Sequence, residues 1–579
     1  MKKIFSAVAV LFFMHGYAQK TLSKDYQYTV SEPYRVVDGD QKFYFSREGS
    51  KQVIALKFDK PEIFIQRFDP DKPGFISEKK YEDFLPEKHD IESVRVFDDK
   101  MYLFFSSWDK PNETEQLYAQ EIDFEKGEFV GKPVLLFKVK GRVSRSGRSL
   151  DASSTADWSK FDIVPSYDKK MFMVQYRKRP EVKKDTKSFD IIGLYTFDTN
   201  LNKLSNKEYT MPYTERRMDN LDYQIDNKGN LYLLAKVFHD DTNKDKKSKK
   251  DTLANYHIEL FTMKKGADDI KIAQVDNGNN FINRLWIFPS PNDELVAAGY
   301  YNNGKGKSRR RNNSYPGIAT PMVGNFWIQH DKASNCDGII MFKMLADGSV
   351  SNIKNYDIPV EIINEFESKR TQKRNAKNEE KGEGAKFTDL TLKNVVYQKD
   401  GSVILVGEQI FTEVYNRGGA MGGMGMGGMN SNTTYKYHFE DILVAKINAD
   451  GTLGWMSKVP KRQIGDNVRN PQGGMSYKFF SNETDHFIVF LDNVKNVGLS
   501  LDKEPAIHSD GNGGYLTSVK ISDADGSYDK GSIFNSRDVE DFKLKQFSTN
   551  RVVKTSATSF VVEAYKKSKE DVLIKIVLK

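Results

Sequence analysis

Cysteine is almost absent from this sequence, since Cys336 is the only one in 579 residues. A single thiol cannot form a disulfide within the chain, so a buried apolar core must hold the fold together. Cys336 could act as a nucleophile or as an intermolecular bridge, or it could be a small residue at the start of a strand. No histidine-containing motif surrounds it, which favours the structural interpretation.

Long apolar runs and local catalytic motifs are also missing. No stretch after the amino-terminal segment approaches the roughly 18 apolar residues that a membrane-spanning helix needs, so we expect no transmembrane segment. The 8 histidines show no H-x-x-x-H spacing, and neither a G-x-S-x-G motif nor a Walker-type glycine loop is present. Local motifs therefore predict no catalytic residue, no cofactor and no metal site.

Residues 1–19 have the composition of an export signal peptide. Lys2 and Lys3 precede a short apolar run from Ile4 to Met14, and small residues surround a cleavage point near Ala18. We expect the chain to be exported, to the periplasm or to the extracellular side or cell surface. The net charge of +8, from 88 basic and 80 acidic residues, is small for this length, so a nucleic-acid partner is not expected.

Three stretches far apart in the chain can be aligned with one another. They are CDGIIMFKMLADGSVS from Cys336, EDILVAKINADGTLGW from Glu440 and GGYLTSVKISDADGSY from Gly513. Each consists of an alternating apolar strand with a lysine, an Asp-Gly turn and the start of a second strand. The aspartates of SDADGS, from Ser522 to Ser527, have a calcium-like spacing, but their place in the repeat predicts a hairpin turn. A unit that recurs and cannot bury its own apolar face indicates a repeat architecture.

A second pattern, a strand, a short polar turn and a more apolar strand, occurs eight times. These hairpins begin at Tyr34, Ser93, Phe161, Leu221, Arg284, Asn394, Tyr477 and Arg551. Most are followed by a second strand pair, and four strands per unit with polar turns at both ends are typical of a propeller blade. We therefore predict an all-β chain whose residues 20–579 form a single closed β-propeller of eight four-stranded blades. Seven blades is the nearer alternative, because the first unit is irregular, and two β-sandwich domains would need a linker that is absent.

The last unit is incomplete, because the chain stops after its third strand. The segment SKDYQYTV, from Ser23 to Val30, precedes the first hairpin and can supply the fourth. Pairing it with the carboxy-terminal blade would remove an open sheet edge, which otherwise promotes aggregation. We predict that Tyr26 and Tyr28 lie beside Leu573 and Ile576.

The blade pattern in residues 336–357, 394–458 and 513–530 resembles that of secreted bacterial β-propeller repeat proteins. The similarity is best in DGSVILVGE, from Asp400 to Glu408, followed by EDILVAKINADGTLGW, which ends at Trp455. This resemblance implies a propeller fold and a setting in the cell envelope. It carries no catalytic residues that could be assigned here.

Three insertions interrupt the predicted strands, at residues 302–329, 361–386 and 415–440, and long loops often carry function. The first contains a basic run with aromatic residues, types that are frequent in binding hot spots; its candidate binding residues are Arg309, Arg310, Arg311, Tyr315 and Trp327. The alternative is a solvated basic loop. Residues 361–386 predict a short surface helix followed by a charged, disordered stretch, which could also serve in docking.

The third insertion combines glycine with four methionines, Met421, Met424, Met426 and Met429, and His438 follows them. Thioethers suit Cu(I), so a copper-handling role is one interpretation. A low-complexity tether whose methionines make loose apolar contacts is the other.

Together these features predict a non-catalytic binding or scaffold module of the bacterial cell envelope, which recognises an envelope protein or glycan through rim loops. The alternatives are a Met-rich copper-handling protein and a propeller enzyme of hydrolase or lyase type. An enzyme site assembled from several blades around the channel would show no local motif. In that case Asp, Glu, His or Arg side chains from at least three blades should converge. The oligomeric state cannot be predicted.

Overall fold

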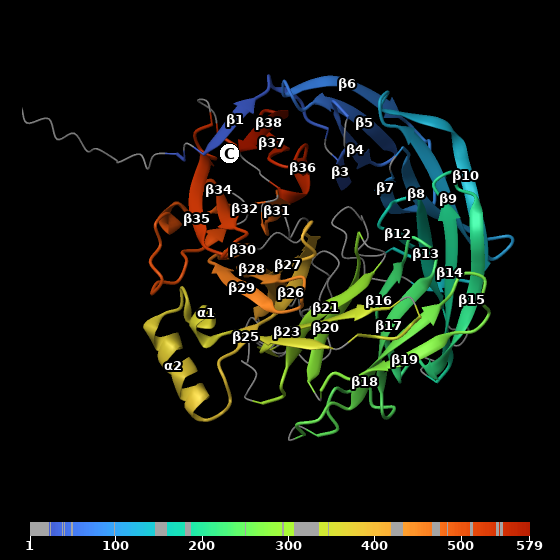
Figure 1. The fold of residues 1–579 in the computed structure, drawn as a ribbon. Coiled ribbons are helices and arrows are strands. Elements are labelled where there is room, and N and C mark those ends of the chain that lie inside the picture. The colour runs from blue at the N-terminus through green and yellow to red at the C-terminus, as the bar shows by residue number, and fades with distance from the viewer. Residues whose placement is uncertain are drawn as a thin grey trace, which may run out of the picture.

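The chain folds into a ring of antiparallel sheets around a central axis (Figure 1). The structure is a computed structural model. It describes residues 22–579 except 24, 38, 40, 48–49, 98, 145–158, 180–186, 249–250, 279, 292–293, 306–334, 346, 352, 418–431, 466–474, 483, 510–512, 540–542 and 545–547. The predicted signal peptide, residues 1–19, lies outside the described part. None of the described helices is long and apolar enough to cross a lipid bilayer.

The ring has eight four-stranded blades, as predicted, numbered here in chain order. Blades 1 and 2 consist of β3 (Gln41–Ser46), β4 (Val53–Asp59), β5 (Glu62–Asp69) and β6 (Gly74–Tyr81), then β7 (His89–Val96), β8 (Met101–Asp109), β9 (Thr114–Asp123) and β10 (Glu128–Lys140). Blades 3 and 4 consist of β12 (Asp162–Pro165), β13 (Met171–Lys178), β14 (Phe189–Asp198) and β15 (Lys203–Thr214), then β16 (Met218–Ile225), β17 (Leu231–Phe238), β18 (Tyr256–Met263) and β19 (Lys271–Val275). In blade 3, β11 (Val143–Ser144) also pairs with β13.

The remaining blades follow the same order. Blades 5 and 6 consist of β20 (Phe281–Pro289), β21 (Leu295–Asn302), β23 (Gly338–Met344) and β24 (Lys354–Asp357), then β26 (Leu390–Tyr397), β27 (Val403–Arg417), β28 (Asn432–Ile447) and β29 (Leu453–Val459). Blades 7 and 8 consist of β31 (Lys478–Ser481), β32 (Asp485–Asp492), β34 (Tyr515–Ser522) and β35 (Tyr528–Asn535), then β36 (Val552–Lys554), β37 (Ser559–Lys567), β38 (Glu570–Leu578) and β1 (Tyr26–Val30). Short pairings join β22 (Asn335–Cys336) to β25 (Phe387–Thr388), and β30 (Gln463–Gly465) to β33 (His508–Ser509).

The amino-terminal strand closes the ring. β1 pairs antiparallel with β38, with Tyr26 opposite Leu578 and Tyr28 opposite Ile576, which confirms the predicted sharing of one sheet by the two ends of the propeller. Tyr26 is buried in the same apolar core as Phe560 and Ile574.

The first blade differs from the prediction in its boundaries. The hairpin expected from Tyr34 is wrong, because Tyr34 and Arg35 form β2, which pairs with β38 of blade 8. Blade 1 begins only at β3, and the segments 53–59 and 62–69 are its second and third strands. The strand pattern that begins at Tyr34 therefore belongs to blade 8, where Tyr34 and Arg35 pair with β38.

The apolar cores lie between neighbouring blades. One such core joins Ile54 and Leu56 of blade 1 to Val94 and Leu103 of blade 2, all fully buried. A single blade cannot bury these side chains alone, so the ring is one cooperative unit.

The Asp-Gly positions of the repeat are tight turns. Asp525 Oδ1 accepts hydrogen bonds from the backbone N–H and the hydroxyl of Ser527. In the other two repeats, Asp347 accepts the same two bonds from Ser349, and Asp450 accepts them from Thr452. The hydrogen bonds from Ser527 lower the pKa of Asp525. Its carboxylate is thus engaged by the turn itself, in agreement with the hairpin interpretation of SDADGS.

The two rims of the ring differ. In an antiparallel blade the connections between strands one and two, and three and four, lie at one rim, here called the short-turn rim. The longest of these runs only from 345 to 353. The connections between strands two and three, and between blades, lie at the other, here called the long-loop rim. Its longest connections are 141–161, 239–255, 303–337, 358–389, 460–477 and 493–514, together with the tip 418–431.

Candidate functional site: the long-loop rim

The connections that contain the three predicted insertions leave and rejoin the ring at the long-loop rim. β27 and β28 remain paired beyond a register shift at Glu408, from Ile410 opposite Phe439 to Arg417 opposite Asn432. The third insertion is therefore a two-stranded arm, here residues 410–417 and 432–439, that continues the blade 6 hairpin. The methionines Met421, Met424, Met426 and Met429 lie outside the described residues, between the two strands of the arm.

His438, at the base of this arm, is held by carboxylates on both sides of its ring. Nδ1 lies 3.1 Å from Glu440 Oε1, Nε2 lies 3.3 Å from Glu413 Oε2, and the ring stacks on Phe411 at 4.3 Å. Burial acts to raise the pKa of Glu440, but the hydrogen bond from His438 outweighs it and the pKa is lowered. Since both ring nitrogens face carboxylates, the geometry gives no support to His438 as a copper ligand.

A buried network lies below the arm, at the seam between blades 6 and 7. The Glu408 carboxylate is fully buried between Lys461, at 2.8 Å, and Lys393, at 3.1 Å. The Ser476 hydroxyl donates to it at 2.6 Å. Lys393 lies at a β-bulge in the inner strand β26. A bulge changes the direction in which a side chain points, and the Lys393 amine reaches Glu408. The network fixes the base of the arm to the ring.

The second insertion is helical over most of its length. It contains α1 (Val360–Asn364) and α2 (Lys369–Glu380), so the charged stretch that was expected to be disordered forms a helix (Figure 1). The buried Lys458 amine anchors it from blade 6 by donating to the carbonyls of Ile363, at 3.2 Å, and Glu365, at 2.7 Å. The Phe366 N–H also donates to the Leu501 carbonyl of the blade 7 connection.

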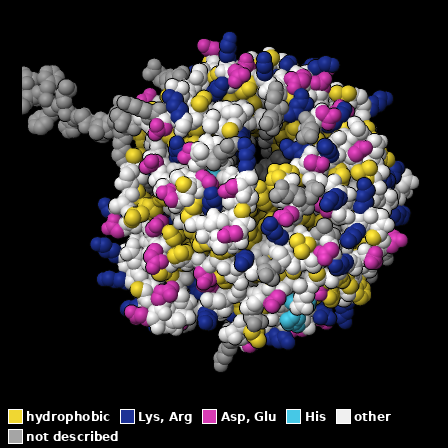
Figure 2. All heavy atoms as spheres, viewed as in Figure 1, with side chains coloured by type: hydrophobic (Ala, Val, Ile, Leu, Met, Phe, Trp, Pro, Cys, Tyr) yellow, Lys and Arg dark blue, Asp and Glu magenta, His cyan; other side chains and the backbone are white. Residues whose placement is uncertain are grey.

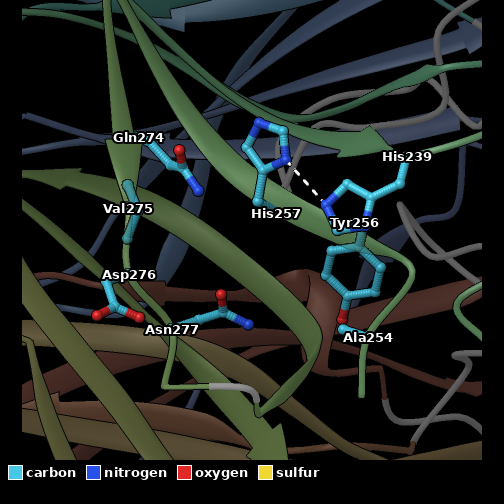
Figure 3. A pocket seen from close by; sticks show the side chains of 8 residues that line it. All are labelled: His239, Ala254, Tyr256, His257, Gln274, Val275, Asp276 and Asn277. Atoms are coloured by element: carbon cyan, nitrogen blue, oxygen red, sulfur yellow. Dashed lines mark hydrogen bonds between the residues drawn. The ribbon is translucent and has the colours of Figure 1, made fainter. Parts of the chain in front are cut away.

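A depression of about 310 Å³ opens at the long-loop rim of blade 4 (Figure 3). His257 Nδ1 lies 3.3 Å from His239 Nε2, and its Nε2 lies 2.9 Å from Glu259 Oε1, which also accepts from Tyr213 at 2.9 Å. Burial and the neighbouring His257 lower the pKa of His239, so that ring is neutral at pH 7. Figure 2 shows histidine side chains at the surface where blade 4 lies.

Gln274, Asp276 and Asn277 add amide and carboxylate groups to the lining of this depression. Within the described part of the chain, no group of three or more His, Cys, Asp or Glu residues could hold a metal ion. Two imidazoles alone fall short of the three protein ligands usual in catalytic zinc sites.

Other buried titratable groups lie in the seams between blades. Between blades 8 and 1, Lys57 Nζ lies 2.6 Å from Glu563 Oε1, and Arg551 lies 3.8 Å from both Glu563 and Asp571. We call this group, with Tyr34 and Tyr44, which donate to Glu563, the closure cluster. Burial acts to raise the pKa of Glu563, but Lys57 and Arg551 outweigh it and hold the pKa at about 2. Burial and the Glu563 charge raise the pKa of Asp571 to about 6.

A similar cluster lies between blades 2 and 3. Burial raises the pKa of Glu92 to about 7, although its carboxylate accepts from Ser106 and from the backbone N–H groups of Lys160 and Phe161. The Lys160 amine reaches Glu115 at 2.6 Å. Glu92 occupies the bulge of β7, as Lys393 occupies that of β26.

One hydrogen-bonded network contains a serine, a histidine and an aspartate, the residue types of a Ser-His-Asp proton relay. Ser481 Oγ lies 2.9 Å from His486 Nδ1, and His486 Nε2 lies 2.9 Å from Asp523 Oδ1. His486 is fully buried, and Asp523 also accepts from Lys446 and, through its carbonyl, from Trp455 of blade 6. The relay thus joins blades 6 and 7, and Lys446 is the lysine of the repeat pattern.

Each of these clusters is built from two neighbouring blades, whereas the enzyme interpretation expects contributions from three or more. Sequence reasoning missed all of them, because their members have no local spacing. Cys336 is fully buried, and burial raises its thiol pKa, so the described geometry does not activate it as a nucleophile.

The candidate residues of the first insertion cannot be compared with the structure. Arg309, Arg310, Arg311, Tyr315 and Trp327 lie outside the described residues. The connection that contains them leaves the ring after Asn302 and returns at Asn335, both at the long-loop rim.

No protein-family model matches the chain, and no curated protein matches it. Similar solved structures include the WD40 domain of SCAP from fission yeast, with 7% identity, TM-score 0.35, and coverage of 95% of this chain and 94% of that one. They also include the β-propeller domain of the Trilobed protease from Pyrococcus furiosus, with 9% identity, TM-score 0.25, and coverage of 64% and 91%. A third is the Synechocystis apocarotenoid oxygenase, with 10% identity, TM-score 0.34, and coverage of 88% and 93%. Similarities this distant carry no information about activity.

Proposed function

We propose that this protein is an exported binding or scaffold module of the bacterial cell envelope, and that its long-loop rim recognises an envelope protein or glycan. The observation that carries the proposal is the difference in loop length between the two rims. One rim consists of connections of at most nine residues, whereas the other bears the arm, the two helices and the longest connections. Loops of this length are not needed to close a propeller, and a rigid scaffold that presents long loops is a common design for recognition.

The arm allows a clean test. Because Arg417 and Asn432 lie directly opposite each other, residues 418–431 can be replaced by an Asn-Gly turn without changing the register of the arm. If the rim recognises a partner, this variant should capture less of that partner from envelope extracts than the native protein does. Its circular dichroism should be unchanged.

A matched control shortens a connection at the opposite rim. Residues 345–353 can be replaced by the five-residue turn 448–452 of the next blade, which occupies the same place in the repeat. This control should keep full capture. If both variants capture the partner as well as the native protein, the arm is not part of the recognition surface. Fractionation and amino-terminal sequencing of the mature protein test the proposed export.

A further inference from the structure

Helix α2 carries five basic side chains on one face. Lys369, Arg370, Lys373, Arg374 and Lys377 are all exposed. At 3.6 residues per turn they span an arc of about 140°. We call this arc the basic face.

The orientation of α2 is fixed by polar contacts on its other side. Asn375 is buried, and its amide donates to Asn364 Oδ1 at 2.7 Å. The Gln372 amide donates to the carbonyls of Asn364, at 3.2 Å, and Glu367, at 3.1 Å. The Ser368 hydroxyl caps the helix by accepting from the Thr371 N–H. These contacts hold the basic face towards solvent.

This arrangement is electrostatically unfavourable for the protein alone. Like charges three or four residues apart on a helix destabilise it, and the basic face contains several such pairs, among them Lys369 with Lys373 and Arg370 with Arg374. Its first turn has no acidic residue, although the positive end of the helix dipole favours one.

Nearby carboxylates do little to neutralise the basic face. Among the described residues, no carboxylate forms an ion pair with any of its five cations. The Ser500 hydroxyl and, more weakly, Lys369 lower the pKa of Asp502 in the blade 7 connection. Of the two glutamates that end α2, Glu379 is engaged by the Ala385 N–H. Glu380 is exposed within the arc of the basic face, three residues after Lys377, and offsets one of the five positive charges. An external polyanion would neutralise the uncompensated charge.

We propose that the basic face of α2 binds a linear anionic polysaccharide. Lys369, Lys373 and Lys377 form a row with a rise of about 6 Å between neighbours, a spacing comparable with that of charged sugar rings along an extended chain. The face contains no aromatic or large apolar residue that could anchor a protein interface. It also lacks the apolar stripe with which amphipathic helices enter a lipid surface.

This inference deepens the proposed function, because α2 belongs to the connection between blades 5 and 6 at the long-loop rim. It names the class of ligand that part of this rim would take. It depends on α2 alone, so it can fail while recognition by the arm stands.

The test compares two variants with the same change in charge. The first replaces the basic face by Lys369→Gln, Arg370→Gln, Lys373→Gln, Arg374→Gln and Lys377→Gln. The control neutralises five exposed lysines of the short-turn rim, by Lys169→Gln, Lys170→Gln, Lys228→Gln, Lys264→Gln and Lys265→Gln. Binding of heparin and of polygalacturonate is measured by calorimetry at low and physiological salt.

The basic-face variant should bind these polysaccharides on the order of a hundredfold more weakly, since each exposed ionic contact contributes a factor of a few in affinity. The control variant should bind like the native protein, and native binding should weaken as salt rises. A third variant, Lys369→Arg, Lys373→Arg and Lys377→Arg, keeps the charge and should keep binding. Melting temperatures no lower than that of the native protein show that all three variants fold.

Equal affinity of the basic-face and control variants would overturn the proposal. Tighter binding of polyglutamate, of phosphatidylglycerol vesicles or of duplex DNA than of either polysaccharide would also overturn it, in favour of an acidic protein, a membrane or a nucleic acid. If the basic-face variant loses polysaccharide binding but still captures an envelope protein through the arm, the two recognition surfaces are separate. If neither variant of the rim affects any binding, the proposed function itself is wrong.

Discussion

Replacing Lys57 with methionine tests whether the closure cluster holds the ring together. The substitution keeps an unbranched side chain, one heavy atom shorter, and removes its charge. Lys57 and Glu563 are both fully buried and their charged atoms lie 2.6 Å apart. The variant would leave the Glu563 carboxylate with Tyr34, Tyr44 and the more distant Arg551. Removing one partner of a buried ion pair costs about 3–5 kcal/mol, and we expect the free energy of unfolding at pH 7 to fall by this amount.

The lowered pKa of Glu563 makes the stability that this carboxylate contributes depend on pH. Its ordinary value is 4.5, and in the folded protein it is about 2, because Lys57 and Arg551 outweigh the effect of burial. A carboxyl group whose pKa is lowered by folding stabilises the protein above pH 4.5, and this contribution is lost as the pH falls towards 2. At 1.36 kcal/mol per pKa unit the contribution is about 3 kcal/mol. In Lys57→Met the pKa of Glu563 rises, so stability is lost at a higher pH.

Asp571→Asn should have the opposite effect. Burial and the Glu563 charge raise the pKa of Asp571 from 3.8 to about 6. A carboxyl group whose pKa is raised by folding stabilises the protein below pH 3.8, and this contribution is lost as the pH rises through 6. The ionised Asp571 is therefore unfavourable at pH 7, and the asparagine variant should be more stable there by up to about 3 kcal/mol.

Urea unfolding followed by tryptophan fluorescence at pH 3, 5 and 7 would measure these effects. Lys140→Met is a matched control, because Lys140 pairs with Glu113 at 3.2 Å and both side chains are 71% exposed. An exposed pair contributes little, so this variant should unfold like the native protein. If Lys57→Met is no less stable than Lys140→Met, the closure cluster does not stabilise the ring and the reasoning is refuted.

Three further predictions concern the edge of the ring, the thiol and the turns. Deleting residues 22–30 would expose the edge of β38 and should cause aggregation detectable by light scattering; a soluble monomer with an unchanged melting temperature would contradict the closure. Cys336 should react with a disulfide reagent far more slowly in the native protein than in urea, because it is buried and burial raises its thiol pKa; equal rates would mean that the thiol is accessible. Replacing Asp525 with alanine should lower the melting temperature slightly by removing its bonds to Ser527, and calcium should not change the native melting temperature, whereas a calcium-dependent rise would indicate a cation site.

The blade number and the closure could be predicted because both depend on local patterns. Alternating apolar residues separated by Asp-Gly turns define hairpins, and a unit that lacks a fourth strand needs one from elsewhere. The start of the first blade could not be predicted. The segment after Tyr34 has the alternation of a strand, but it pairs with Asp571 and Glu570 near the other end of the chain. Local pattern does not reveal such a partner.

The candidate site was predicted less completely. Long insertions indicated where the rim would be elaborated, but the charged stretch after Glu367 was expected to be disordered. Its helix depends on Asn375 and Gln372, whose amides contact Asn364. Polar anchoring of this kind leaves no apolar periodicity in the sequence. The seam clusters were also invisible, because residues such as Lys57 and Glu563 lie in strands at opposite ends of the chain.

Perturbed pKa values often indicate active sites, but three carboxyl groups with perturbed pKa values, Glu92, Glu563 and Asp571, lie in the seams between blades of this ring. Glu92, Glu563 and Asp571 each connect two adjacent blades, and their charged neighbours are also buried or half-buried. These groups meet their charged neighbours only when the blades are in the correct register, so their pKa shifts are explained by assembly of the ring. The basic face of α2 is the opposite case. Its charges are exposed, mutually repulsive and without ion-pair partners among the described residues, so an external anion is what would stabilise them. Recognition should therefore be sought first at α2 and at the arm.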